Sequence, residues 1–251
     1  MRVVAIIQAR MSSSRLPGKV LLPLAGKPVL AHVVRRISAC NNVCEVVVAT
    51  STDESDDTID NWCSENEVSC FRGSLHDVLD RYYQAAKMFK AEAIVRITAD
   101  CPAIDTQTVD EVIDGFLAGP YDTYGLSGGF PDGLDCVVFT FAAIQRAWRE
   151  ATLPSEREHV GPYLYKNPHL FRNGGMEKFK GLEHMRWTLD EPQDYEFLSR
   201  VYEHMAANDL FTADNLLELL QAKPELQTIN QSIVRNEGYI ISLTKEILPH
   251  G

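Results

Sequence analysis

The feature that most constrains the fold is a regular alternation of short apolar runs with longer amphipathic segments. The runs are rich in β-branched residues, which indicates buried strands, and the segments have the apolar spacing of helices. Such an alternation is typical of strand–helix–strand units, whose strands lie parallel in one sheet. We expect strands at 3–8, 45–50, 68–71, 93–98, 134–139 and 185–189, and helices at 28–37, 55–66, 77–89, from 105, 140–150 and 192–205.

The length of the chain fits one large α/β domain, so we expect a single domain over residues 1–251. Glycine and proline become frequent near residue 119, and 151–183 has no regular pattern. We therefore expect residues 120–183 to form an excursion from the sheet that acts as a lid, an acceptor-side segment or a dimer contact. Residues 206–251 are expected to form a C-terminal helical tail.

The overall charge and the cysteines bear on the class of protein. The formal net charge is -11, with 24 basic and 35 acidic residues, which argues against binding to a nucleic-acid polymer. No apolar run is long enough to span a bilayer, and the first residues do not resemble a signal peptide. We therefore expect a cytoplasmic protein with no membrane partner. Its six cysteines are then expected to be reduced thiols, and the lack of a Cys-x-x-Cys pair argues against a structural zinc site.

The positive charges are concentrated near the N-terminus. Residues 1–44 contain seven lysines and arginines and no acidic residue, whereas the other 207 residues carry 17 basic and 35 acidic ones. A cationic segment in an acidic protein predicts a local site for a small anion. The alternative is an ordinary solvated face.

The loop after the first expected strand carries Arg10, Arg15 and Lys19. Ligands of open α/β sheets bind beyond the carboxyl ends of the strands, and arginine and lysine side chains suit phosphate oxygens. The loop is not a Walker A motif, because Ser13 and Val20 stand where that motif needs Gly and Ser or Thr. We therefore predict a nucleoside triphosphate site of another type, the alternative being an ordinary polar loop.

Two aspartates, Asp100 and Asp190, follow the expected strands 93–98 and 185–189. Both would lie at the carboxyl edge of the sheet, opposite the basic loop. Mg²⁺ is typically held by one or two carboxylates together with substrate phosphates and waters. The two residues are therefore candidate Mg²⁺ ligands, although each can also be a turn or helix-cap residue.

Six segments and part of the tail have sequences that together carry a resemblance. They are 6–19 (IIQARMSSSRLPGK), 71–83 (FRGSLHDVLDRYY), 96–105 (RITADCPAID), 130–137 (FPDGLDCV), 156–163 (EREHVGPY), 186–194 (RWTLDEPQD) and 230–243. Together they resemble the cytidylyltransferase family that includes the CMP-sialate and CMP-ulosonate synthetases. The resemblance is strongest to its spore-coat polysaccharide biosynthesis branch and covers nearly the whole chain.

The resemblance implies a three-layer α/β/α nucleotidyltransferase fold, Rossmann-like and GT-A-like, with a mostly parallel sheet. It also implies a homodimer in which 120–183 supplies a contact. By the resemblance, the triphosphate ligands and the Mg²⁺ ligands are those already singled out from the sequence. The remaining nucleotide-binding candidates that it implies are Gln8, Ala9, Arg72 and Thr98.

The implied reaction is attack of an acceptor oxygen on the α-phosphorus of CTP, with pyrophosphate as leaving group. Arg10, Lys19 and Asp100 are the candidate catalytic residues, since positioning and charge neutralisation dominate such transfers. The acceptor is expected to be a sugar or sugar acid of a cell-surface, spore-coat or flagellar glycan. Candidate acceptor-binding residues are Asp135, Glu158 and His159.

Several alternatives remain open from the sequence. His159 is a candidate general base, but a structural histidine explains it equally well. A nucleotide-sugar-dependent glycosyltransferase of the same fold usually carries an Asp-x-Asp motif, which Asp100-Cys101-Pro102 does not supply. A non-catalytic nucleotide-binding module is a further alternative, and the base can be cytosine or guanine.

Overall fold

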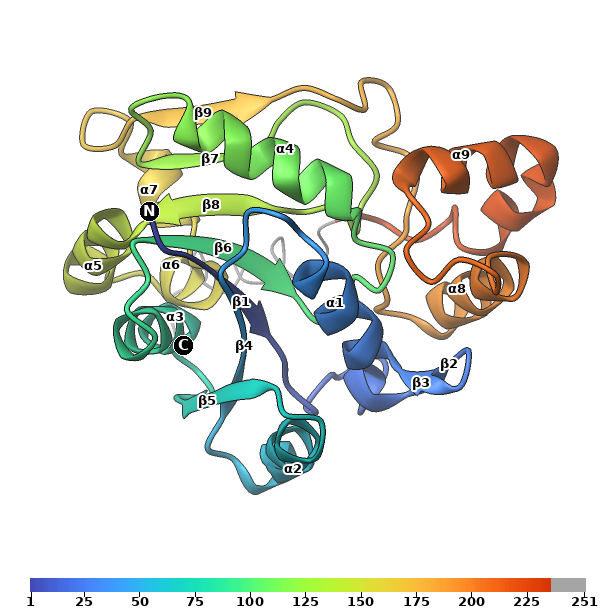
Figure 1. The fold of residues 1–251 in the computed structure, drawn as a ribbon, viewed down its shortest axis with the longest axis horizontal. Helices are drawn as coiled ribbons and strands as arrows, with labels where there is room; N and C mark the ends of the chain where they lie inside the picture. The colour runs from blue at the N-terminus through green and yellow to red at the C-terminus, as the bar shows by residue number, and fades with distance from the viewer. Residues whose placement is uncertain (236–251) are drawn as a thin grey trace, which may run out of the picture.

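The computed structural model describes residues 1–235. Its centre is a seven-stranded sheet with the strand order β5-β4-β1-β6-β8-β7-β9, and β2 and β3 form a separate hairpin (Figure 1). The strands are β1 (Val3–Gln8), β2 (Pro23–Leu24), β3 (Lys27–Pro28), β4 (Glu45–Ser51), β5 (Ser69–Gly73), β6 (Ala93–Thr98), β7 (Thr123–Leu126), β8 (Val137–Thr140) and β9 (Asn173–Met176).

Four neighbouring strands, β5, β4, β1 and β6, run parallel, so their carboxyl ends meet at one edge of the sheet. The strand β8 is antiparallel to both β6 and β7, and β9 returns parallel to β7. The expected mostly parallel α/β sheet is therefore confirmed. Its central strands are continuous apolar runs because both of their faces are buried.

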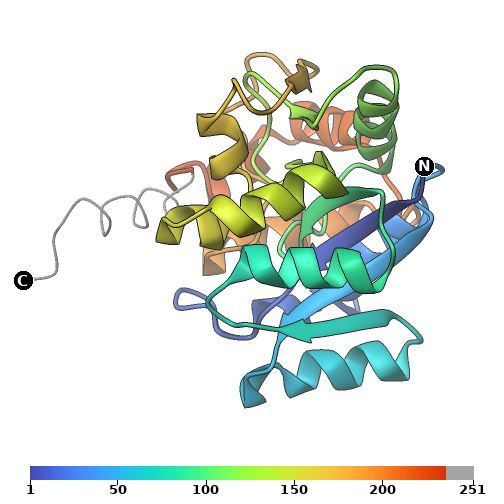
Figure 2. The ribbon, with the colours of Figure 1, turned by 90° about the vertical axis from the view of Figure 1, so that its left-hand side faces the viewer.

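Helices cover both faces of the sheet. Along β1, Ala5 and Ile7 pack toward α1, α2 and α4, whereas Val4 and Ile6 pack toward α3 and α5. Figure 2 views the molecule from the side on which α3 and α5 lie next to each other. This arrangement confirms the three-layer fold. The helices are α1 (Val29–Ser38), α2 (Asp57–Glu65), α3 (Val78–Met88), α4 (Thr106–Leu117), α5 (Phe141–Glu150), α6 (Pro154–His159), α7 (Pro162–Lys166), α8 (Pro192–His204) and α9 (Ala213–Ala222).

A third apolar cluster joins α8 and α9 to the β2–β3 hairpin beyond the sheet (Figure 1). Trp187, Phe197 and Leu216 are fully buried in it, and Leu24 connects it to the hairpin. The cluster anchors the C-terminal helices beside the carboxyl edge of the parallel strands. The predicted tail contains α9 and a short 3-10 helix, Pro224–Ile229, and residues 236–251 lie outside the described part.

The prediction of a strand at 185–189 was wrong. This segment makes only an isolated bridge between Asp132 and Arg186, and the Leu189 N–H donates to the Asp100 carbonyl over 2.8 Å. Its apolar side chains, Trp187 and Leu189, are buried against α8 rather than in the sheet. A short apolar run thus signalled burial, but not pairing with a neighbouring strand.

Residues 120–183 are more regular than the sequence indicated. They supply β7, β8 and β9 to the sheet and the helices α5, α6 and α7 to one face. The strand β8 begins at Val137, later than the predicted residue 134. No helix within residues 1–235 is long and apolar enough to cross a membrane.

Candidate functional site

The candidate site lies where the loops after β1 and β6 meet the segment before α8. Gln8 and Thr98, the last residues of β1 and β6, are direct partners in the parallel sheet. The loop after β1 reaches Lys19 through Gly18, whose φ of +70° is a left-handed conformation suited to glycine. The loop after β6 carries Asp100. A hydrogen bond from the Leu189 N–H to the Asp100 carbonyl brings Asp190 next to Asp100.

The ammonium of Lys19 joins the two predicted metal ligands. Its Nζ lies 2.6 Å from Asp100 Oδ2 and 2.6 Å from Asp190 Oδ1, and it also donates to the Leu189 carbonyl over 2.8 Å. These contacts use all three N–H donors of the ammonium. The lysine side chain is only 10% exposed. The structure thus brings together the three residues that carried the prediction, although they come from distant parts of the chain.

Electrostatics holds this group in its charged form. Burial alone would raise the pKa of the Asp100 carboxyl, but the nearby Lys19 ammonium overcomes this and lowers that pKa to about 2. Burial likewise opposes the charge on Lys19, but Asp100 and Asp190 raise its pKa above the usual value. The Asp100 carboxylate and the Lys19 ammonium therefore both remain ionised at neutral pH.

The other predicted triphosphate ligands lie on the same loop. Arg15 Nη2 lies 3.1 Å from Asp190 Oδ1, and its Nε lies 3.4 Å from Glu191 Oε1. Arg10 is exposed at the start of the loop.

The loop is held by Asp56, a fully buried carboxylate that the sequence analysis did not single out. It accepts the Met11 N–H at 2.7 Å and the Ser51 N–H at 3.2 Å. Asp56 thereby ties the beginning of the basic loop to the end of β4.

The predicted nucleotide-binding residues at the strand ends are in different environments. Gln8 Oε1 is buried and accepts no hydrogen bond from the described residues, and the Ala9 N–H is bound by the Ala49 carbonyl. The Thr98 hydroxyl lies 3.1 Å from Cys101 Sγ. Arg72 faces α2, where it donates to the Ser51 carbonyl and pairs with Asp57. Gln8 and Thr98 are thus adjacent to the Lys19 group, whereas Arg72 is engaged on β5, two strands away from β1.

Two of the candidate acceptor residues come from another part of the molecule. Glu158 and His159 end α6, which packs on α3, and their side chains lie 3.8 Å apart. Val160 follows with φ +69°, and the Gly161 N–H donates to the His159 carbonyl over 2.8 Å, which makes a classic γ-turn. This rare backbone conformation fixes the end of α6.

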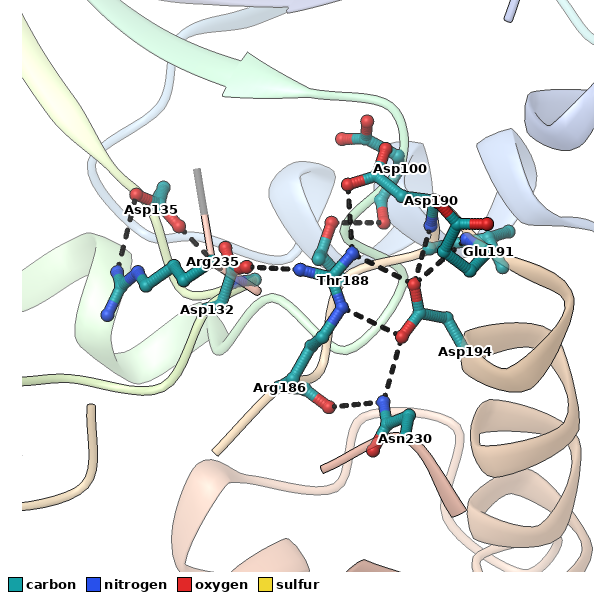
Figure 3. A network of polar contacts seen from close by, with 12 residues as sticks. Asp100, Asp132, Asp135, Arg186, Thr188, Asp190, Glu191, Asp194, Asn230 and Arg235 are labelled. Carbon is teal, nitrogen blue, oxygen red and sulfur yellow. Dashed lines mark hydrogen bonds and ion pairs between the residues drawn. The ribbon is translucent and has the colours of Figure 1, made fainter. Parts of the chain in front are cut away.

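The third candidate acceptor residue, Asp135, precedes β8. It accepts the Gly133 N–H at 3.2 Å and lies 3.9 Å from the guanidinium of Arg235 (Figure 3). Gly133 has φ +105°, and a Cβ there would lie 2.6 Å from the Trp187 backbone. Only glycine lets this turn approach the 185–189 segment so closely.

A buried network around Arg186 supports Asp190 (Figure 3). The Arg186 guanidinium contacts Asp132, Asp190 and Asp194, and its side chain is only 5% exposed. Burial and the charge of Asp135 raise the pKa of Asp132 to about 6, against the opposing effect of Arg186. The sequence analysis did not single out Arg186, Asp194 or Asn230. All three stand in segments that carry the resemblance, and Asp194 also has a local signal, since it stands three residues after Glu191 at a helix start.

The oxygen donors present fit a hard divalent cation. Asp100 and Asp190 each direct one carboxylate oxygen to the same point, which the Lys19 ammonium marks. No group of three or more histidine, cysteine or acidic side chains suited to a metal is found among residues 1–235. Two carboxylates leave positions for phosphate oxygens and waters, as Mg²⁺ requires. Together with the basic loop, this arrangement can bind a metal-complexed polyphosphate.

Residues 4–217 match the family model described as Cytidylyltransferase. The chain is 33% identical over 236 residues to the spore coat polysaccharide biosynthesis protein SpsF of Bacillus subtilis, covering 90% of this chain and 97% of that protein. It is 27% identical over 255 residues to a 3-deoxy-manno-octulosonate cytidylyltransferase of Bradyrhizobium diazoefficiens, covering 90% and 95%.

A solved structure has the same fold over its whole length. A cytidylyltransferase from Leptospira borgpetersenii superposes with a TM-score of 0.87 at 33% identity, covering 94% of this chain and 100% of that one. The family match over residues 4–217 spans the basic loop and both aspartates.

Proposed function

The chain belongs to the cytidylyltransferase family, and from that premise we propose that it transfers CMP from CTP to a sugar-acid acceptor with the help of Mg²⁺. The observation that carries this proposal is the convergence of Asp100 and Asp190 on Lys19 beside a loop of arginines. This geometry provides carboxylates for a cation and cations for a triphosphate at one edge of the sheet.

The basic loop has the role of binding the triphosphate. Phosphate oxygens can replace the two carboxylates as partners of Lys19, and Asp100 and Asp190 would then hold the metal. Arg10 and Arg15 neutralise the β- and γ-phosphates, where negative charge accumulates as pyrophosphate leaves. Bound Mg²⁺ would polarise the phosphate oxygens.

The acceptor class is inferred from the relatives. The Bradyrhizobium relative is named for an eight-carbon sugar acid, and the Bacillus relative for polysaccharide biosynthesis. We therefore assign the acceptor to the sugar acids of surface glycans. Its oxygen attacks the α-phosphorus in line while the leaving pyrophosphate is held by the basic loop.

The proposal is tested in two steps. A thermal-shift comparison of CTP, GTP, ATP, UTP and a CMP-sugar, with and without Mg²⁺, should single out CTP with Mg²⁺. A ligand at about 100 times its Kd stabilises the protein by roughly 2.7 kcal/mol. Pyrophosphate release is then measured with CTP and a panel of sugar acids.

A matched pair of variants tests the site. Asp100→Asn should lower kcat by a factor on the order of 10² or more. The control is Asp209→Asn, because Asp209 pairs with Lys27 and Arg35 at the surface. Equal rates in both folded variants would refute the assignment of Asp100, and a shift with a CMP-sugar but not with CTP would refute the reaction.

A further inference from the structure

The residue that the proposed function leaves without a role is Arg186. It stands four residues before Asp190 and is nearly buried, yet it contacts three carboxylates (Figure 3). A buried guanidinium among three carboxylates can hold each of them in a fixed orientation. The contacts of each carboxylate show what that role is.

The first carboxylate, Asp194, fixes both the guanidinium and the backbone beside Asp190. Arg186 Nε and Nη2 donate to its two oxygens over 2.9 Å each, as a bidentate fork. The N–H groups of Asp190 and Glu191 also donate to Asp194 Oδ2, over 3.0 and 2.9 Å. Asp194 is fully buried, so these contacts are shielded from water.

The second carboxylate is Asp190 itself, and its two oxygens have different partners. Oδ2 accepts from Arg186 Nη2 at 3.0 Å. Oδ1 points to Lys19 Nζ at 2.6 Å and to Arg15 at 3.1 Å. Oδ2 is therefore held by Arg186, and Oδ1 is directed to Lys19 Nζ, to which Asp100 Oδ2 also points.

The third carboxylate, Asp132, binds the far side of the guanidinium at 2.7 Å. Asn230 closes the network from the C-terminal segment, donating over 2.9 Å to Asp194 Oδ1 and over 3.0 Å to the Arg186 carbonyl. Asn230 thus supports the network without touching Asp190 in these contacts. We call Asp132, Asp194 and Asn230 the buried frame. Among residues 1–235, the Arg186 guanidinium is the group that links this frame to the side chain of Asp190.

We propose that Arg186 is a positioning residue of the metal site, which holds Asp190 Oδ2 so that the carboxylate offers only Oδ1 to the cation. The inference rests on the proposed role of Asp190 as a metal ligand. A lysine can replace the charge of Arg186 but not its planar fork, which binds Asp194 and Asp190 together. Partners that orient metal ligands typically change metal affinity by about 10–100-fold when they are removed.

The test measures Mn²⁺ binding by electron paramagnetic resonance in the full-length protein. Arg186→Lys should weaken Mn²⁺ binding in the presence of CTP by about tenfold or more. Its CTP affinity without metal should stay within about twofold, because the basic loop is unchanged. Arg186→Gln, which keeps one donor without the charge, is the second variant if the lysine variant does not fold, and it should weaken Mn²⁺ binding in the same way.

Asn230→Ala is the matched control, since it removes two hydrogen bonds from the same buried network and leaves the guanidinium on Asp190. It should lower stability but keep the Mn²⁺ affinity. Unchanged Mn²⁺ binding in a folded Arg186 variant, or an equal loss in Asn230→Ala, would overturn the inference. Asp190→Asn separates the two proposals, because unchanged Mn²⁺ binding in that variant would refute the metal site itself.

Discussion

Replacing Lys19 by methionine tests whether the lysine ammonium stands in for a divalent cation. The ammonium is hydrogen-bonded to Asp100 and Asp190, 2.6 Å from each. Removing it leaves two carboxylates directed to one point without their cation. Methionine keeps most of the side-chain volume, so the change is mainly one of charge.

The magnitude follows from Asp100. Burial would raise the pKa of its carboxyl, but Lys19, with smaller contributions from the Thr98 hydroxyl and the Asp100 backbone N–H, lowers it from 3.8 to about 2. This shift corresponds to about 2 kcal/mol in favour of the ionised folded state. Because this pKa is depressed in the folded protein, the contribution is complete above pH 3.8 and is lost as the pH falls toward 2. At pH 7, Lys19→Met should therefore destabilise the protein by about 2 kcal/mol.

Urea unfolding at pH 7 measures this loss, with and without Mg²⁺ and with KCl matched for ionic strength. Mg²⁺ should stabilise Lys19→Met more than the unchanged protein, because no ammonium has to leave the carboxylates first. Lys27→Met is the control, since Lys27 is 51% exposed and pairs with Asp209 away from the site. If Mg²⁺ stabilises Lys19→Met and the unchanged protein equally, Lys19 and a divalent cation do not share the site between the two carboxylates, and the reasoning is refuted.

Two further predictions concern buried aspartates. Asp56→Asn should weaken CTP binding about tenfold, because Asp56 holds the Met11 N–H and a charge-assisted contact that orders the binding loop is lost. Isothermal titration calorimetry measures the Kd for CTP. An unchanged Kd in a folded variant would contradict this prediction. Burial and Asp135 raise the pKa of Asp132 to about 6, so the folded state binds more protons than the unfolded state, and this group's contribution to stability should fall as the pH rises through 6. Asp132→Asn should lose that dependence, which is measured as the change in unfolding free energy between pH 5 and pH 7.5. The same change in the variant and in the unchanged protein would show that Asp132 is not the group responsible.

The sequence predicted the elements whose formation depends on local pattern. The strands β1 and β6 begin and end at the predicted residues, because a strand buried on both faces is a continuous apolar run. The helix α4 begins as expected after Asp105, whose side chain accepts the Thr108 N–H. These signals lie within a few residues of each other and need no distant partner.

Elements defined by distant pairing could not be predicted in the same way. The strand β9 has the sequence NGGM and shows no strand pattern of its own, yet it pairs with β7. Conversely, the apolar segment 185–189 is buried but forms no strand, because its polar backbone groups bond to Asp132 and Asp100 instead. Whether a short run joins a sheet depends on which backbone lies beside it.

The candidate site divides in the same way. The sequence alone determined the charges of the site, a basic loop after the first strand and two aspartates suited to a cation. Only the tertiary structure decided that Lys19 binds both aspartates, which lie 81 and 171 residues away along the chain. It also decided that Arg186 joins Asp190 to a buried frame closed by Asn230. Hydrogen bonds and ion pairs act over a few ångströms, so their partners are set by the folded backbone and not by spacing along the chain.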